Sequence, residues 1–169
     1  MGRAEDLLAA WLEELGFTGD PEMAETAERF TTFLRGFRAP VEAPSLSTLP
    51  SAGEEIVALR EIPFHSLCAH HLLPFFGTAG IAYRPAGRLA GFGGLARVVQ
   101  HHAHRPQIQE RMAREIAVTL GEALAPEGVV VRLVARQLCM EMRGARSAGE
   151  AEVVATWGEH TAGLLDRLR

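Results

Sequence analysis

The chain opens with two segments in which apolar residues recur at steps of three and four. These residues are Leu7, Leu8, Trp11, Leu12 and Leu15 in the first segment, and Met23, Ala27, Phe30, Leu34 and Phe37 in the second. Such spacing places the apolar side chains on one face of an α-helix. The sequence GFTGDP between the two segments is typical of a helix end. We therefore predict one helix around residues 7–15 and a second from about Pro21 to Leu34.

A different pattern begins at residue 54. Four segments are rich in β-branched and aromatic residues and are bounded by glycine or proline, which is typical of strands: EEIVALREIPF, FFGTAGIAYRP, GVVVRLVARQLCM and AEVVATWGE. Between the second and third of them, LARVVQHHAH predicts a short helix, and apolar residues at every fourth position from Ile108 to Leu124 predict a long helix. This order predicts the α+β class: an antiparallel four-stranded sheet with two helices on one face.

The segment RGFRAPVEAPSLSTLPSAG separates these two parts and contains three prolines. Proline-rich stretches without apolar periodicity are typical of linkers. We therefore predict an N-terminal helical arm at residues 1–38, a linker at 39–53 and a larger domain at 54–169.

Composition and charge narrow the function classes. The 169 residues are 47% hydrophobic and 22% charged, so the chain is able to bury a core. A formal net charge of -4 gives no footprint for nucleic acid or an anionic membrane. The N-terminus lacks the apolar core of a signal peptide, and no segment approaches the roughly 20 apolar residues of a membrane span. We expect a cytoplasmic protein that binds neither nucleic acid nor membrane.

The stretch FHSLCAHHLLPF places Cys68, His70 and His71 in four positions of an otherwise apolar segment. The spacing of Cys68 and His71 suits two ligands of one ion, and catalytic zinc takes three such ligands and a water. Cys139, the second of two cysteines, would complete the set, leaving His70 free for proton transfer. The alternatives are two buried thiols or a disulfide, and a reducing compartment disfavours the disulfide.

Three separated segments resemble the signatures of the GTP cyclohydrolase I family. FHSLCAHHLLPFFG is similar to S-x-C-E-H-H-L-L-P-F-x-G, RPQIQERM to R-x-Q-x-Q-E-R, and QLCMEMRG to H-L-C-M-x-x-R-G. The resemblance runs in order from about Thr26 to Gly158. It implies a tunnelling fold, in which sheets of several subunits join into a barrel, commonly as a decamer of two pentamers with sites between subunits. The family's reaction opens the imidazole ring of GTP, releases formate and forms dihydroneopterin triphosphate.

The resemblance also implies residue roles. The Zn²⁺ ligands would be Cys68, His71 and Cys139. His70 would be the adjacent catalytic histidine. Glu110 resembles the carboxylate that accepts hydrogen bonds from N1–H and the 2-amino group of guanine, with Gln109 beside it as a helper. A paired acceptor of this kind selects guanine over adenine, because the edge of adenine presents the wrong pattern.

Contacts to the triphosphate are implied only in part. Arg29, Arg97 and Arg143 match family positions that carry cations, and guanidinium groups suit phosphate. The family's G-L-S-K is GFGG here, so Gly93 and Gly94 offer neither a hydroxyl nor an ammonium group. Losing one charge-assisted contact costs roughly 1.5 to 3 kcal/mol, so we expect weaker binding of a triphosphate.

Two further departures affect the chemistry. Gln137 stands at the position of a catalytic histidine, and an amide cannot donate a proton at neutral pH. Ala69 replaces the acidic residue of C-E-H-H, where a carboxylate would tune the metal site.

These departures suggest a divergent paralogue that binds zinc and a guanine-type ring. It would accept a less phosphorylated or modified purine or pterin, or would stop at the ring-opened formamidopyrimidine. A non-catalytic purine-binding homo-oligomer with structural zinc is the alternative reading. The retention of His70 beside an open zinc position argues against it.

Overall fold

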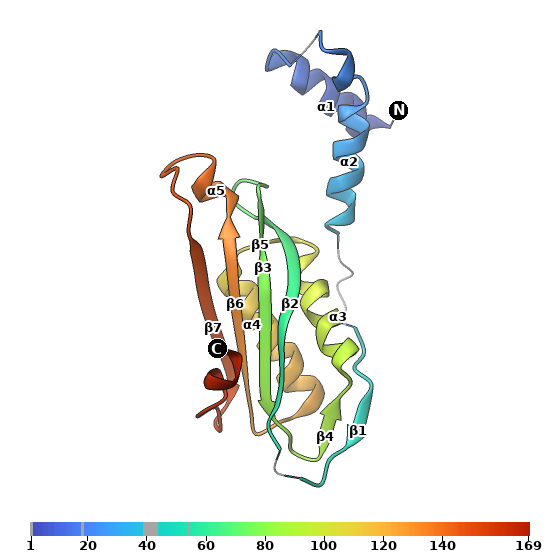
Figure 1. Cartoon of the computed structure of the whole chain (residues 1–169). Helices are drawn as coiled ribbons and strands as arrows, with labels where there is room; N and C mark the ends of the chain where they lie inside the picture. Colours follow the sequence, from blue (N-terminus) through green and yellow to red (C-terminus); the bar gives the residue numbers. More distant parts are fainter. Residues whose placement is uncertain (1, 18, 39–43, 54) are drawn as a thin grey trace. The chain divides into compact units, whose positions relative to one another are not determined.

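The computed structural model describes residues 2–17, 19–38, 44–53 and 55–169 (Figure 1). The chain divides into two units, Met1–Arg38 and Ala39–Arg169. Of the predicted linker, residues 39–43 lie outside the described residues, as does residue 54, where the larger domain was predicted to begin. Within the predicted linker, a short strand, β1 (Thr48–Pro50), pairs antiparallel with β4 (Arg88–Ala90).

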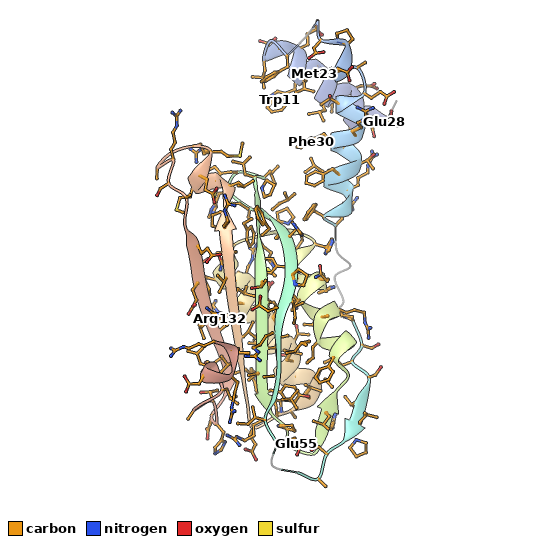
Figure 2. All side chains as sticks on the ribbon, viewed as in Figure 1. Trp11, Met23, Glu28, Phe30, Glu55 and Arg132 are labelled. Carbon is orange, nitrogen blue, oxygen red and sulfur yellow. The ribbon has the colours of Figure 1, made fainter. Side chains whose placement is uncertain are left out.

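The first unit consists of three helical segments: α1 (Arg3–Glu14), the 3-10 helix η1 (Pro21–Met23) and α2 (Thr26–Gly36). The prediction of one continuous helix from Pro21 was wrong. The Asp20 side chain accepts a hydrogen bond from Glu22 N–H at 2.9 Å and starts a single 3-10 turn, after which α2 begins separately. Trp11 on α1 and Phe30 on α2 help to line a small apolar hollow (Figure 2).

The second unit is built on a five-stranded sheet with the order β5-β2-β3-β6-β7. Its strands are β2 (Val57–Cys68), β3 (Pro74–Arg84), β5 (Pro106–Gln107), β6 (Gly128–Gln137) and β7 (Glu150–Gly158). The four long strands pair antiparallel with one another, as predicted.

The fifth strand corrects the prediction of a four-stranded antiparallel sheet. β5 is two residues long and runs parallel to the end of β2, where Cys68 is paired with Gln107. The Ala69 N–H donates to the Gln107 carbonyl oxygen at 2.8 Å. Two residues are too few to give a periodic pattern, so only the tertiary pairing defines this strand.

Two helices, α3 (Phe92–Ala103) and α4 (Gln109–Leu124), cover one face of the sheet (Figure 1). The core between them is fully buried and includes Phe64, Leu95, Met112, Ile116 and Leu133. On the other face, the short helix η2 (Leu165–Leu168) packs against the sheet. The α+β class and the two-helix layer predicted from the sequence are therefore confirmed. In the described part of the chain, no helix is both long and apolar enough to cross a membrane.

The close approach of β3 and β6 at Gly77 generates a testable prediction. A Cβ atom at Gly77 would lie 1.9 Å from the backbone oxygen of Val134. Because that oxygen belongs to a paired strand, Gly77→Ala requires the sheet to shift, and we expect it to lower the free energy of unfolding by about 1–3 kcal/mol. The measurement is urea denaturation. Gly149→Ala is the matched control, because its Cβ would meet only the flexible Met140 at 3.7 Å. Equal stability of the two variants would contradict this prediction.

Candidate functional site

The candidate site lies at the end of the sheet where β2 and β6 finish and β3 and β7 begin (top of the sheet in Figure 1). The strand pairing places Leu67 opposite Pro74 and Phe75 opposite Gln137. A short helix, α5 (Leu138–Glu141), follows β6 directly and carries Cys139. Residues far apart in the sequence therefore meet at this end of the sheet.

A tight turn after β2 holds two of the predicted metal ligands. Cys68 is buried, and its carbonyl oxygen accepts from His71 N–H at 3.3 Å and from Leu72 N–H at 2.8 Å. Leu72 has a positive φ of 54°, which reverses the chain toward β3. The turn brings His71 Nδ1 to 3.6 Å from Cys68 Sγ.

Cys139 completes the group. One ligand atom each from Cys68, His71 and Cys139 lie within 4.8 Å of one another, and both cysteines are free thiols. Two sulfur atoms and one imidazole nitrogen are a donor set that zinc prefers, with a fourth position left for water or substrate. The structure therefore brings together the three predicted ligands, and their chemistry fits zinc.

The surroundings of this group affect its protonation. Burial raises the pKa of the Cys139 thiol, and the neighbouring Cys68 raises it further. A bound metal cation has the opposite effect on the thiol pKa, because a coordinating cysteine loses its proton to bind the metal as a thiolate. His71 Nδ1 faces the Cys68 thiol, and Nη1 of Arg143 lies 2.6 Å from His71 Nε2. A guanidinium only donates, so this contact requires an unprotonated Nε2, and zinc bound through Nδ1 would place the ring proton on Nε2 and displace Arg143. Arg143, predicted as a phosphate contact, thus lies against a metal-ligand candidate.

A cavity of about 350 Å³ opens beside the two cysteines. Four residues that the sequence singled out line it: His70, Gln109, Glu110 and Gln137. Sequence reasoning missed other lining residues, namely Gln107, Ile108, Ala151, Glu152 and Val153. Gln107 lies inside the recognised RPQIQER segment, but the three β7 residues carry no motif that could have indicated them.

Glu110 and Gln109 lie side by side at the start of α4 but differ in exposure. Glu110 is exposed, whereas Gln109 is 4% exposed. Successive helical residues point in different directions, so only Gln109 turns into the core. Glu152, on β7, also lines the cavity and accepts two hydrogen bonds from Arg132, at 2.9 and 2.6 Å.

Two of the predicted phosphate contacts, Arg29 and Arg97, are not among the described residues that line the cavity. Arg97 is exposed on α3, beside Gly93 and Gly94. Arg29 belongs to the first unit, on α2, where it forms an exposed ion pair with Glu25 at 2.6 Å. Their roles stay predictions.

A buried polar network supports the cavity wall at Gln107. Its side-chain N–H donates to Glu115 at 2.6 Å, and Arg105 donates to the same carboxylate oxygen at 2.6 Å. Arg105 also donates to His102 Nδ1 at 3.1 Å, so His102 Nε2–H donates to the Thr119 hydroxyl at 2.8 Å. His102 is therefore the neutral tautomer that carries its proton on Nε2. Its Nδ1 accepts a hydrogen bond, and its Nε2–H donates one.

This network predicts a pH-dependent stability. Burial lowers the pKa of His102 to about 4. In the unfolded chain a histidine titrates near pH 6.5, so the unfolded state takes up the extra proton as the pH falls below about 6.5. We expect this residue to cost about 2 kcal/mol of stability between pH 7 and pH 5. Urea denaturation at both pH values should show a smaller loss in His102→Gln than in wild type. A control variant, His160→Gln, should keep the wild-type loss, and an equal loss in all three proteins would contradict the prediction.

The fold and the site together define a class of protein: an α+β sheet protein with a Cys-His-Cys group, suited to a metal, beside a polar cavity. The sequence comparisons narrow this class. Residues 4–163 match the GTP cyclohydrolase I family, and the chain belongs to that family.

Individual relatives agree with this placement. The chain is 50% identical over 101 residues to a GTP cyclohydrolase 1 from Streptococcus gordonii, a match that covers 59% of this chain and 54% of the relative. The chain thus spans about half the length of the first relatives that it matches. It is 36% identical over 157 residues to a GTP cyclohydrolase 1 from Streptococcus agalactiae serotype Ia, covering 89% of this chain and 84% of that one.

A solved structure is also similar. The archaeosine synthase QueF-Like in its apo form matches with a TM-score of 0.51 and 19% identity, over 64% of this chain and 98% of that chain. At this level of identity the likeness concerns the fold alone, and it agrees with the α+β architecture described above.

Proposed function

We propose that this protein is a zinc-dependent hydrolase that opens the imidazole ring of a guanine nucleotide, with release of formate. The observation that carries the proposal is the meeting of Cys68, His71 and Cys139 beside a cavity that His70 and Glu110 also line. Membership of the GTP cyclohydrolase I family supports the same chemistry.

The zinc would be held by Cys68, His71 and Cys139. When bound, zinc supplies a Lewis acid that turns water into a nucleophile near neutral pH. His70 lies in the same turn, between Cys68 and His71, and lines the cavity. Its imidazole is therefore the group proposed to accept and return a proton.

Glu110 is proposed to select the base. Its carboxylate lies at the cavity and accepts hydrogen bonds only, which matches the N1–H and 2-amino donors of guanine. Adenine lacks this pair of donors, so it would cover the Glu110 carboxylate without giving it hydrogen-bond partners, which disfavours adenine. The substrate class is therefore a guanine-type ring.

A second candidate is a reaction that stops at the ring-opened formamidopyrimidine, or that acts on a less phosphorylated purine or pterin. Gln137 favours the first of these, because it takes the position of a family histidine on the cavity wall and has no proton to donate. Gly93 and Gly94, which replace a serine and a lysine of the family's motif, favour a substrate with fewer phosphates.

We also propose that the protein acts as a homo-oligomer, a decamer of two pentamers as in its family. Within the described residues, β7 pairs only with β6 and forms one edge of the sheet. Pairing of such an edge with the sheet of a neighbouring subunit would close a barrel and remove the exposed backbone groups. Cytoplasmic localisation stays a prediction from the sequence.

The experiment combines metal content with product analysis. The full chain is purified with zinc, its metal is measured per subunit, and formate and product masses are followed with GTP, GMP, guanosine and guanine. We expect about one zinc per chain and formate from at least one substrate. In Cys139→Ala, zinc affinity and formate release should fall by more than about 100-fold, because losing a ligand costs more than losing a supporting contact. Met140→Leu, the adjacent residue, is the matched control.

The products and the zinc content distinguish the proposed functions. A product with the mass of the opened formamide supports the shortened reaction, and a dihydropterin supports the full one. Zinc without turnover of any of the four compounds would indicate the non-catalytic binding protein. A wild-type chain that binds no zinc would overturn the proposal.

A further inference from the structure

Gln109 is buried at the start of α4, and both hydrogens of its side-chain amide are used. Its Nε2 donates to the backbone carbonyl oxygen of Leu133 on β6 at 3.1 Å and to that of Ala151 on β7 at 2.9 Å. An amide nitrogen has two N–H groups, so neither remains for a ligand. Gln109 therefore ties the start of α4 to two neighbouring strands.

These two bonds also fix the orientation of the amide. If the oxygen and nitrogen of Gln109 exchanged places, an acceptor would face two carbonyl oxygens in a buried site, which is costly. Oε1 of Gln109 must therefore point the other way, where it accepts from Nε2 of Gln137 at 2.7 Å. Because a carbonyl oxygen only accepts, the group that residue 137 turns toward Gln109 must be a donor.

The orientation of Gln137 follows in the same way. One N–H of its amide is used by Gln109, and among the described residues no hydrogen bond uses the carbonyl oxygen or the second N–H. Gln137 lines the cavity together with Cys68 and Cys139. What residue 137 offers a ligand is thus a neutral pair of one acceptor and one donor.

We propose that Gln109 is a positioning residue that sets which atoms of Gln137 face the cavity, and that Gln137 is the contact for an amide-type group of the substrate. This inference rests on the proposed function, since it takes a guanine-type ring as the occupant. The formamide formed when such a ring opens presents one N–H and one carbonyl oxygen, and this pair complements a carboxamide. Gln109 then acts through Gln137 and makes no substrate contact of its own.

A double-mutant cycle on the zinc-loaded full chain distinguishes positioning from direct contact. The variants are Gln109→Met, Gln137→Leu and the double variant, and the readout is kcat and KM for formate release from GTP. If Gln109 acts only through Gln137, each single substitution lowers kcat/KM by about tenfold or more. The kcat/KM of the double variant then lies within about twofold of that of the less active single variant. Independent contacts would multiply instead, and that result would overturn the proposal.

A matched control accounts for the lost backbone contacts. Gln100 lies on α3 and donates its side-chain N–H to the carbonyl oxygen of Pro63 at 2.6 Å, away from residue 137. Gln100→Met therefore removes a bond of the same kind and should leave kcat/KM within about twofold of wild type.

A further variant keeps Gln109 intact, in case Gln109→Met does not fold. Gln137→Glu is similar in size to glutamine but offers acceptors only at pH 7.5. We expect kcat/KM of Gln137→Glu to be at least about tenfold below that of wild type. Equal values would overturn the role of Gln109 as the group that demands a donor.

Crystal structures separate this proposal from the proposed function. In Gln137→Glu the introduced carboxylate should turn away from Gln109, while the Gln109 amide keeps its bonds to Leu133 and Ala151. A carboxylate that still faces Gln109 would overturn the positioning role even if the enzyme is active. If wild type turns over none of the substrates, the proposed function fails, and the structures still decide whether Gln109 orients residue 137.

Discussion

The pairing of β2, β3 and β6 is the constraint on which the rest of the site depends. Cys68 ends β2, and Cys139 follows the last residue of β6 within two positions, so their meeting requires this register. Side chains alternate between the faces of a sheet, so a slip of one residue would exchange every inward and outward position. Gly77 lets β3 and β6 approach closely, and the turn at Leu72 then returns His71 to the thiol of Cys68.

Buried glutamine side chains fix the cavity-forming elements whose positions are not set by the pairing of β2, β3 and β6. Gln107 fixes β5 against the end of β2 through its backbone and reaches Glu115 through its side chain. Gln109 fixes the start of α4 against β6 and β7 and orients Gln137. A buried polar group without a partner costs about 1–3 kcal/mol, so each of these amides specifies one arrangement of its neighbours.

The sequence predicted those features that repeat or that carry distinctive chemistry. Apolar periodicity predicted the long helix after residue 108, and segments rich in β-branched and aromatic residues between glycines and prolines predicted the four long strands. The spacing of Cys68 and His71 indicated a shared ion, for which Cys139 was the expected third ligand. Features that depend on tertiary pairing were missed. β5 is too short for a pattern, the turn at Asp20 interrupts an otherwise helical period, and β7 supplies cavity residues without a motif. Residue spacing could not show that both side-chain N–H groups of Gln109 donate to backbone carbonyl oxygens, because these bonds depend on the positions of β6 and β7 in the folded sheet.

X-ray absorption spectroscopy at the zinc edge of the zinc-loaded full chain tests the proposed metal site. The proposed ligands are Cys68, His71 and Cys139, with an oxygen or nitrogen atom in the fourth position. The first shell should therefore contain two sulfur atoms at about 2.3 Å and two nitrogen or oxygen atoms at about 2.0–2.1 Å. A first shell with no sulfur, or with only one sulfur atom, would contradict the assignment of both cysteines.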